Sequence, residues 1–197
     1  MKSIIDVSEL RGPLGELLDQ FSSAENGRER FEEFKLWQKS VSSLLQPGAT
    51  VEVAAVKRFV ARERLAATNI GWTGENLKRL FLDKVEENVP AGRITISFLV
   101  QPSLDFEIQA ALGRARRVIH LAHLFQLLEK QAKGQAGPLL TSGMANVAYC
   151  FGGDGNVWAV HASWDSFVRY WYVEAYSVGS PIEWDAGFQV LSQASGA

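Results

Sequence analysis

Three histidines and one cysteine are the residues of this 197-residue chain best suited to metal binding or nucleophilic chemistry. His120 and His123 are three positions apart, so they would point the same way from a helix, as metal ligands do. Cationic neighbours disfavour a divalent metal, and the apolar residues of the same segment would lie on the opposite side. We therefore expect both histidines on a solvated polar stripe of a helix over residues 116–133.

Cys150 and His161 fall on neighbouring predicted strands, which would allow a nucleophile and a base to meet. No catalytic signature surrounds Cys150, and a lone cysteine in a strand is more often a buried structural residue. The loop Gly152-Gly153-Asp154-Gly155 lacks the lysine and the following helix of a phosphate-binding loop, and it predicts a hairpin turn. The sequence thus predicts no catalytic residue, no metal and no cofactor.

The most specific surface feature is an aromatic row on a strand predicted over residues 169–178. Alternation places Trp171, Val173 and Ala175 on one face and a Tyr–Tyr–Glu–Tyr row on the other. Aromatic side chains with a polar end are enriched in protein interfaces. We expect a protein-binding face made of this row and of two tryptophans in the flanking loops: Tyr170, Tyr172, Glu174, Tyr176, Trp164 and Trp184. The alternative is that the row packs on the 116–133 helix and is buried.

A second candidate surface is basic. Residues 51–133 hold thirteen Lys or Arg against nine Asp or Glu, whereas residues 134–197 hold one Arg against five acidic residues. Helices predicted over residues 51–67 and 73–88 could form a helix-turn-helix. A duplex reader usually carries a stronger positive bias than this. The residues that would contact nucleic acid are Arg58, Arg62, Lys78, Arg79, Arg116 and Arg117.

The spacing of apolar residues predicts the helices and strands that carry these residues. The spacing is typical of helices in the first part of the chain and of strands in the last part. We expect a short strand over residues 1–7 and helices over residues 8–21, 26–45, 51–67 and 73–88. Glu86 and Glu87 would lie on solvated faces of the last of these. A strand over 94–100, a short helix ended by Gly113 and the 116–133 helix come next. The final strands are expected over residues 146–151, 156–163, 169–178 and 188–192.

This order of elements predicts an α+β fold, with a helical N-terminal half followed by a C-terminal antiparallel β-meander. We expect one compact domain over residues 1–197. Residues 1–92 would be mainly helical, residues 93–133 would form a strand and two helices, and residues 134–197 would form the meander.

Composition restricts the class of protein. Hydrophobic residues make up 47% of the chain and charged residues 21%, which is ordinary for a globular domain. A single cysteine excludes a disulfide scaffold, and the absence of about 18 consecutive apolar residues predicts no membrane span. The first residues, MKSIIDVSELRG, carry charges where a signal peptide needs an apolar stretch, so we expect a cytoplasmic protein.

Four segments resemble parts of a group of uncharacterised bacterial proteins, over residues 68–81, 103–113, 139–164 and 171–196. This resemblance implies a bacterial, cytoplasmic setting. The stretch IIDVSELRGPLGELLDQ, residues 4–20, is similar to the N-terminus of Phd/YefM-type antitoxins. In that family a strand and a helix at this place form a dimeric DNA-binding unit. The match ends at Gln20, because the segment FEEFKLWQKSVSSLL predicts a helix where the family has a hairpin.

Together these features predict a non-catalytic protein-binding or accessory module whose partner is another protein. A nucleic-acid-binding regulator that uses the basic helices is the alternative. A small hydrolase or transferase is the third hypothesis.

Overall fold

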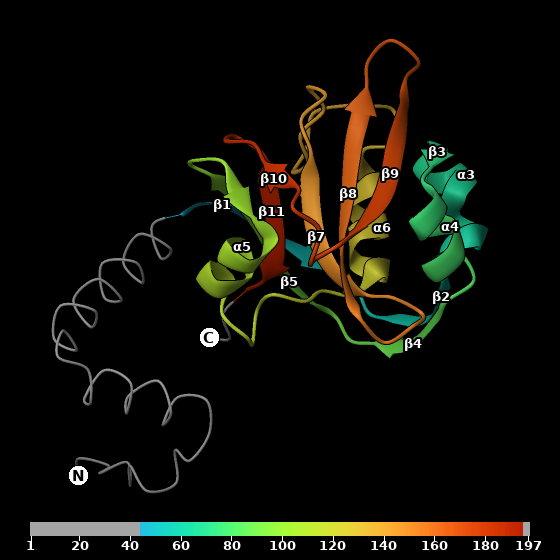
Figure 1. Cartoon of the computed structure of the whole chain (residues 1–197). Coiled ribbons are helices and arrows are strands. Elements are labelled where there is room, and N and C mark those ends of the chain that lie inside the picture. Colours follow the sequence, from blue (N-terminus) through green and yellow to red (C-terminus); the bar gives the residue numbers. More distant parts are fainter. Residues whose placement is uncertain (1–43, 195–197) are drawn as a thin grey trace, which may run out of the picture. The chain divides into compact units, whose positions relative to one another are not determined.

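The computed structural model describes residues 44–194, and residues 1–43 and 195–197 lie outside that description. A seven-stranded sheet dominates the described residues (Figure 1), with the strand order β1-β5-β11-β7-β8-β9-β3. Of these residues, 42% are in strands and 21% are helical. No helix among them is long and apolar enough to cross a membrane.

The sheet strands are β1 (Leu45–Val53), β3 (Ile70–Thr73), β5 (Gly92–Leu99), β7 (Asn146–Phe151), β8 (Val157–Asp165), β9 (Tyr170–Ser177) and β11 (Gln189–Gln193). Two short ribbons pair β2 (Val56–Val60) with β4 (Val85–Val89), and β6 (Ser103–Leu104) with β10 (Glu183–Trp184). The helices are the 3-10 turn η2 (Ala61–Arg64), α3 (Leu65–Thr68), α4 (Glu75–Leu80), α5 (Asp105–Leu112) and α6 (Leu121–Lys130).

The sheet is mixed. Strands β7, β8 and β9 are antiparallel neighbours, as consecutive strands joined by short turns usually are. Strand β11, however, runs parallel to β7 and antiparallel to β5, and β3 runs parallel to β9. The C-terminal strands therefore do not form a separate meander, because they share one sheet with strands from residues 45–99.

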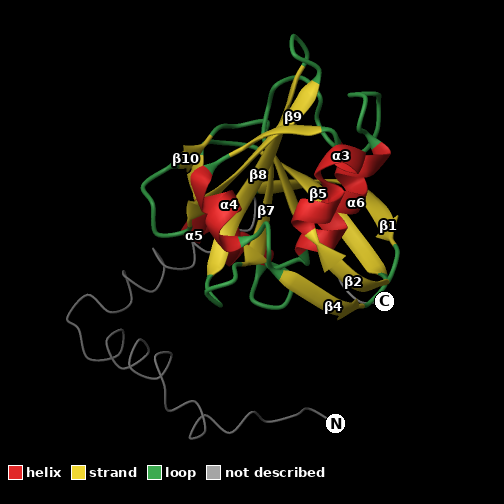
Figure 2. Cartoon of the chain, turned by 90° about the vertical axis from the view of Figure 1, so that its right-hand side faces the viewer, coloured by secondary structure: helices red, strands yellow, loops and turns green. Residues whose placement is uncertain are grey.

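Each face of the sheet has its own hydrophobic core. Helix α6 covers one face together with the β2–β4 ribbon, and α5 covers part of the other face with the β6–β10 ribbon (Figures 1 and 2). Phe125 and Trp171 are fully buried on the α6 side, whereas Ile108 and Tyr149 are fully buried on the α5 side. The face that carries the β9 tyrosines is thus the one that α5 covers in part.

The expected helical N-terminal half is wrong for the residues that the structure describes. Residues 51–67 form the end of β1, then β2 and two short helices, instead of one helix. Valine is β-branched and favours strands, and the spacing of Val51, Val53 and Val56 is compatible with either period. Pairing decides the outcome, because Val51 lies opposite Ile94 of β5, and β2 pairs with β4. The fold is mostly β with a mixed sheet.

Two further helices are shorter than expected. Of residues 73–88, only Glu75–Leu80 is helical, and Val85–Val89 is strand β4. Of residues 116–133, only Leu121–Lys130 forms α6, since the preceding segment runs beside β7 and Val118 bridges to Tyr149. The five later strands are present as β5, β7, β8, β9 and β11, with bounds shifted by at most two residues. The elements expected within residues 1–43 lie outside the described residues.

Candidate functional site

Strand β9 presents two faces of different chemistry. The three residues that point to the α6 side are fully buried: Trp171, Val173 and Ala175. The four that alternate with them lie on the opposite face and are half-buried: Tyr170, Tyr172, Glu174 and Tyr176. The row therefore does not pack on α6, which lies on the other side of the sheet.

Three neighbouring aromatic rings, one exposed and two half-buried, lie where β9 meets β3, and we call Trp72, Tyr170 and Tyr172 the aromatic cluster. Trp72 lies opposite Tyr172 in the strand register, and their ring centroids are 5.6 Å apart. The centroids of Tyr170 and Tyr172 are 5.0 Å apart, and their hydroxyls lie within hydrogen-bonding distance at 3.1 Å. That hydrogen bond raises the pKa of Tyr172. Trp72 is 43% exposed, so a large apolar surface faces solvent here.

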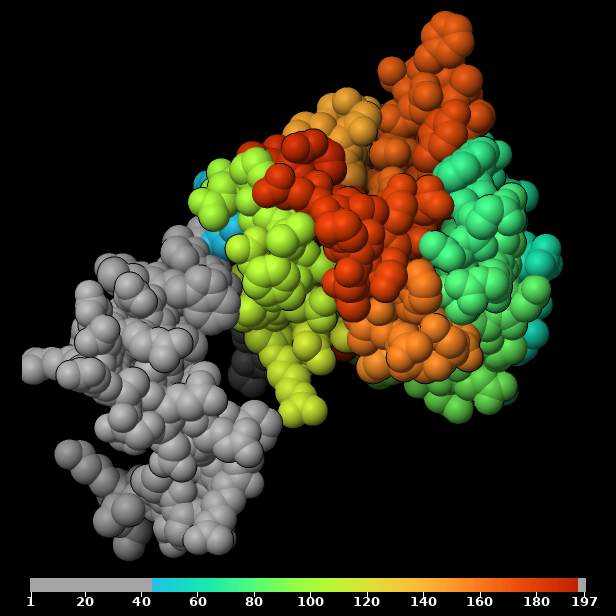
Figure 3. Space-filling model, viewed as in Figure 1, coloured from blue at the N-terminus to red at the C-terminus, as the bar shows by residue number. Residues whose placement is uncertain are grey.

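The β8–β9 hairpin adds a further exposed ring. It projects from the body of the molecule (Figure 3), and Phe167 at its tip is 93% exposed. Asp165 Oδ1 accepts hydrogen bonds from the backbone N–H groups of Phe167 and Val168 at 2.8 Å and 3.1 Å. The turn is thus held by its own side chain, and it presents the Phe167 ring to solvent.

The Tyr176 end of the β9 row Tyr170, Tyr172, Glu174 and Tyr176 is covered by other side chains. The His161 ring stacks on Tyr176, with centroids 5.4 Å apart and planes 7° apart. Trp184 of β10 packs against both rings and is buried. Its Nε1 donates a hydrogen bond to Asp105 Oδ1 at 2.8 Å. Trp184 therefore closes the row at this end and does not rim an open surface.

Trp164 lies on the other side of the sheet. Strand β8 extends to Asp165, so Trp164 is a strand residue and not a loop residue. Its ring is buried in the α6-side core, 5.4 Å from that of Trp171. Among the predicted protein-binding residues, the structure thus brings Tyr170 and Tyr172 together with Trp72, leaves Glu174 and Tyr176 beside them, and separates Trp164 from all of these.

Cys150 and His161 do not form a nucleophile–base pair, because they belong to opposite faces of the sheet. Cys150 is fully buried in the α6-side core, and burial raises the pKa of its thiol. His161 packs against Trp184 and Tyr176 on the α5 side, where burial lowers its pKa to about 4. A neutral imidazole and a protonated thiol on two faces cannot act on one substrate.

The basic residues do not form the expected helix-turn-helix, because residues 51–67 are divided between the end of β1, β2 and two short helical turns. Three cations are instead paired with carboxylates: Arg58 with Glu63, Arg62 with Asp83 and Lys78 with Glu75. Arg79 lies over the Trp158 ring at 5.9 Å, and Arg116 Nε donates to the Leu112 carbonyl. The sixth predicted nucleic-acid contact, Arg117, lines a hollow of about 630 Å³ beside β4.

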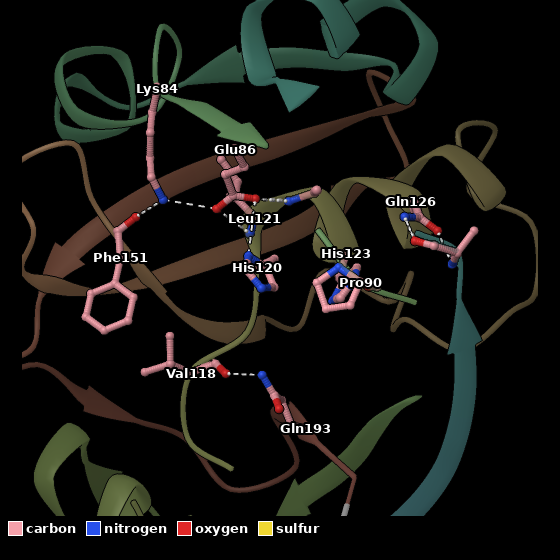
Figure 4. Close-up of polar contacts among 12 residues, drawn as sticks. Lys84, Glu86, Pro90, Val118, His120, Leu121, His123, Gln126, Phe151 and Gln193 are labelled. Carbon is pink, nitrogen blue, oxygen red and sulfur yellow. Dashed lines mark hydrogen bonds and ion pairs between the residues drawn. The ribbon is translucent and has the colours of Figure 1, made fainter. Parts of the chain in front are cut away.

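A hollow of about 630 Å³ lies between β4, the segment before α6 and the ends of β7 and β11. Glu86 is its central buried group (Figure 4). The carboxylate accepts hydrogen bonds from the N–H groups of Leu121 at 3.2 Å and Ala122 at 3.0 Å, which are the first of α6. Lys84 Nζ lies 3.0 Å from Glu86 Oε1 and also donates to the Phe151 carbonyl at 2.7 Å. The helix N-terminus and the lysine therefore neutralise the Glu86 charge.

The two neighbouring histidines have different surroundings. His120 is half-buried at the wall of the hollow, with Nδ1 3.9 Å from Glu86 Oε2. His123 is only 4% exposed, and its Nε2 lies 3.0 Å from the Pro90 carbonyl oxygen. Burial lowers the pKa of His123, and its Nδ1 is buried without a partner among the described residues. The solvated stripe expected for both residues is thus wrong for His123.

In residues 44–194, no three His, Cys, Asp or Glu side chains are grouped as they would be around a metal ion. No family model, no curated protein and no solved structure matches this chain. The antitoxin-like stretch, residues 4–20, lies outside the described residues. The described residues therefore offer two candidate sites, the aromatic cluster and the hollow beside His120.

Sequence reasoning missed Trp72, Phe167, Lys84 and Glu86. Trp72 carries no signal by itself, because only the parallel pairing of β3 with β9 brings it to Tyr172. Lys84 and Glu86 are two positions apart, a spacing that places both side chains on one face of a strand. An extended assignment that began at residue 84, just before β4, would have placed both on one side, whereas the helical assignment made Glu86 a solvated residue.

Proposed function

We propose that this chain is a non-catalytic protein-binding module and that the aromatic cluster, with Phe167 beside it, is the binding surface. The observation that supports this most is a run of three neighbouring rings, Trp72, Tyr172 and Tyr170, whose successive centroids are 5.6 Å and 5.0 Å apart. Clustered exposed aromatic residues mark interaction surfaces, and Trp and Tyr supply most of the binding free energy at such surfaces.

The rings are held in place before any partner arrives. The backbone of Gly71 lies against the Tyr170 ring, where a Cβ would collide with it. The Asn69 side chain donates to the Arg169 carbonyl at 2.8 Å and ties β3 to the start of β9. Trp171, between the two tyrosines, is anchored in the core and donates from Nε1 to the Gln131 carbonyl. Binding by such a surface loses little conformational entropy.

The partner that fits is an extended segment of another protein that carries proline or other apolar side chains. The planes of neighbouring rings are tilted by about 40° to one another. Shallow grooves between such rings fit an extended polyproline-type backbone. One of the two tyrosine hydroxyls donates to the other, and the second is left to donate to a carbonyl group of the partner segment. Asp165 lies close enough to raise the pKa of Tyr172, so a basic residue in the partner segment would be favoured here.

The basic residues support the nucleic-acid alternative less well, since Arg58, Arg62 and Lys78 are each engaged by a carboxylate.

We place the module in the cytoplasm, on the ground that its one cysteine is buried and forms no disulfide.

The test is a peptide-array screen with the full chain, followed by titration of the best peptides. We expect proline-containing peptides to bind, and Trp72→Ala or Tyr172→Ala to weaken them by about tenfold or more. Phe106→Ala is the matched control, because Phe106 is also an exposed aromatic residue but lies on α5. It should change affinity by less than about twofold.

Two outcomes would contradict the proposal. One is a screen in which no peptide binds, or in which the cluster variants bind as wild type does. The other is self-association through the cluster, seen by light scattering as a dimer that Trp72→Ala converts to a monomer.

A further inference from the structure

We infer that the hollow beside His120 binds a small organic anion in which a phosphate stands next to a flat ring, a nucleoside monophosphate being the simplest example. The hollow is about 630 Å³, within the range of pockets that enclose ligands of this size. It lies away from the aromatic cluster, so this site is independent of the proposed protein-binding surface.

The charge of the walls favours a phosphate. Arg114, Arg117 and His120 line the hollow, and neither arginine forms an ion pair within residues 44–194. Guanidinium groups bind phosphate through two parallel N–H donors, which makes them the side chains of choice for this ligand. Two carboxylates also line the hollow. Glu86 is neutralised by Lys84 and the α6 N–H groups, so it repels an incoming anion only weakly. Glu87 is exposed to solvent, which screens its charge, and the cations Lys84, Arg114 and Arg117 outnumber the two carboxylates.

The remaining walls favour a ring. Phe151 is 49% exposed beside the hollow, and its backbone is held by the Lys84 ammonium group. Val118 contributes an apolar surface. The Gln193 side chain donates its N–H to the Val118 carbonyl at 3.1 Å, which leaves its carbonyl oxygen to accept from a ring amino group (Figure 4). An aromatic side chain stacks on a nucleobase, and an amide reads its polar edge.

The same walls argue for binding and against turnover. Lys84 and Glu86 are engaged with each other and with backbone groups, so neither is available as an acid or a base. Cys150 is fully buried in the α6-side core and does not line the hollow. A ligand held here would thus be sensed or stored by the full chain rather than converted.

The experiment is calorimetric titration of the full chain with the 5′-monophosphates of adenosine, guanosine, cytidine and uridine, with adenosine and inorganic phosphate as partial probes. We expect at least one monophosphate to bind more tightly than either partial probe. Arg117→Ala, alone or with Arg114→Ala, should weaken binding by about tenfold or more. Phe151→Ala should weaken the monophosphate but leave inorganic phosphate unchanged.

Arg169→Ala is the matched control, because it removes an exposed arginine of the β8–β9 turn, at the opposite end of β8 from Val157, the partner of Phe151. Thermal melting of each variant without ligand shows whether it folds, and Arg117→Lys serves where Arg117→Ala does not. The inference is overturned if no monophosphate binds at millimolar concentration, or if the Arg114 and Arg117 variants bind as Arg169→Ala does. It is also overturned if a single-stranded oligonucleotide binds while mononucleotides do not, which would favour a nucleic-acid surface.

Discussion

Asp105 and Tyr149 are joined in the interior by a 2.7 Å hydrogen bond from the tyrosine hydroxyl to the carboxylate Oδ1. Trp184 Nε1 donates to the same oxygen, while Oδ2 is buried without a partner in the described part of the chain. Burial raises the pKa of Asp105, and the two hydrogen bonds offset only part of this effect. The contact ties α5, β7 and β10 together beneath the covered end of the β9 row.

The raised pKa of Asp105 predicts a specific pH dependence of stability. A group whose pKa is higher in the folded than in the unfolded protein stabilises the fold at pH values below its unfolded-state pKa. This stabilisation is lost as the pH rises through its folded-state pKa. Asp105→Asn keeps an oxygen acceptor but cannot ionise. Urea titrations give the free energies of unfolding of wild type and of Asp105→Asn. We expect the difference, wild type minus Asp105→Asn, to decrease as the pH rises from 4 to 7. A difference that grew with pH would contradict this account.

Asp105→Ala provides the comparison for that prediction. It leaves the Tyr149 hydroxyl and the Trp184 N–H buried without an acceptor, at a cost of about 1–3 kcal/mol for each group. We expect Asp105→Ala to be less stable than Asp105→Asn at every pH.

His161 should destabilise the fold in acid. Its pKa is lowered by burial to about 4, so the neutral form favours the fold above the unfolded pKa of 6.5. This contribution is lost as pH falls from 6.5 towards 4. We expect the stability of wild type to fall by on the order of 2 kcal/mol relative to His161→Phe between pH 7 and pH 4.5. Urea titrations of both proteins at these two pH values measure it, and parallel pH profiles would refute it.

Glu86 should be more important for stability than its neighbour Glu87. Glu86→Ala leaves two α6 N–H groups without their acceptor and removes the carboxylate partner of Lys84, and we expect it to cost about 2–4 kcal/mol. Glu86→Gln retains an oxygen acceptor and should lie between alanine and wild type. Glu87→Ala is the matched control on the exposed side of β4, where a change within about 0.5 kcal/mol is expected. Equal effects of the two alanine variants in chemical denaturation would show that the buried contacts stabilise nothing.

Gly134 should not tolerate a side chain. It has a positive φ of 66°, and a Cβ would collide with the buried Trp164 ring. Backbone strain and the displaced ring together predict a loss of about 2–4 kcal/mol for Gly134→Ala. Gly92→Ala places its Cβ in open space and should change stability by less than about 1 kcal/mol. Thermal melting distinguishes the two, and a stable Gly134→Ala would mean that Trp164 repacks freely.

The later strands were predictable because their signals are local. Alternation along residues 170–177 separates Trp171, Val173 and Ala175 from the tyrosines with no reference to other segments. Gly113 ends α5 with a φ of 73°, as a glycine after an apolar helical run predicts. The sequence by itself therefore determined which face of β9 carries the tyrosines.

The tertiary structure decided where periodicity is ambiguous and where segments distant in sequence meet. Residues 51–60 fit either a helix or a strand, and pairing with β5 and β4 selects the strand because it satisfies their backbone groups. His123 is buried because Pro90 supplies its hydrogen-bond acceptor, and Glu86 is buried because α6 begins against it. Trp72 joins Tyr172 only through a parallel strand pair, which no local pattern specifies. Both candidate sites consist of such long-range contacts, and for that reason neither could be assembled from the sequence alone.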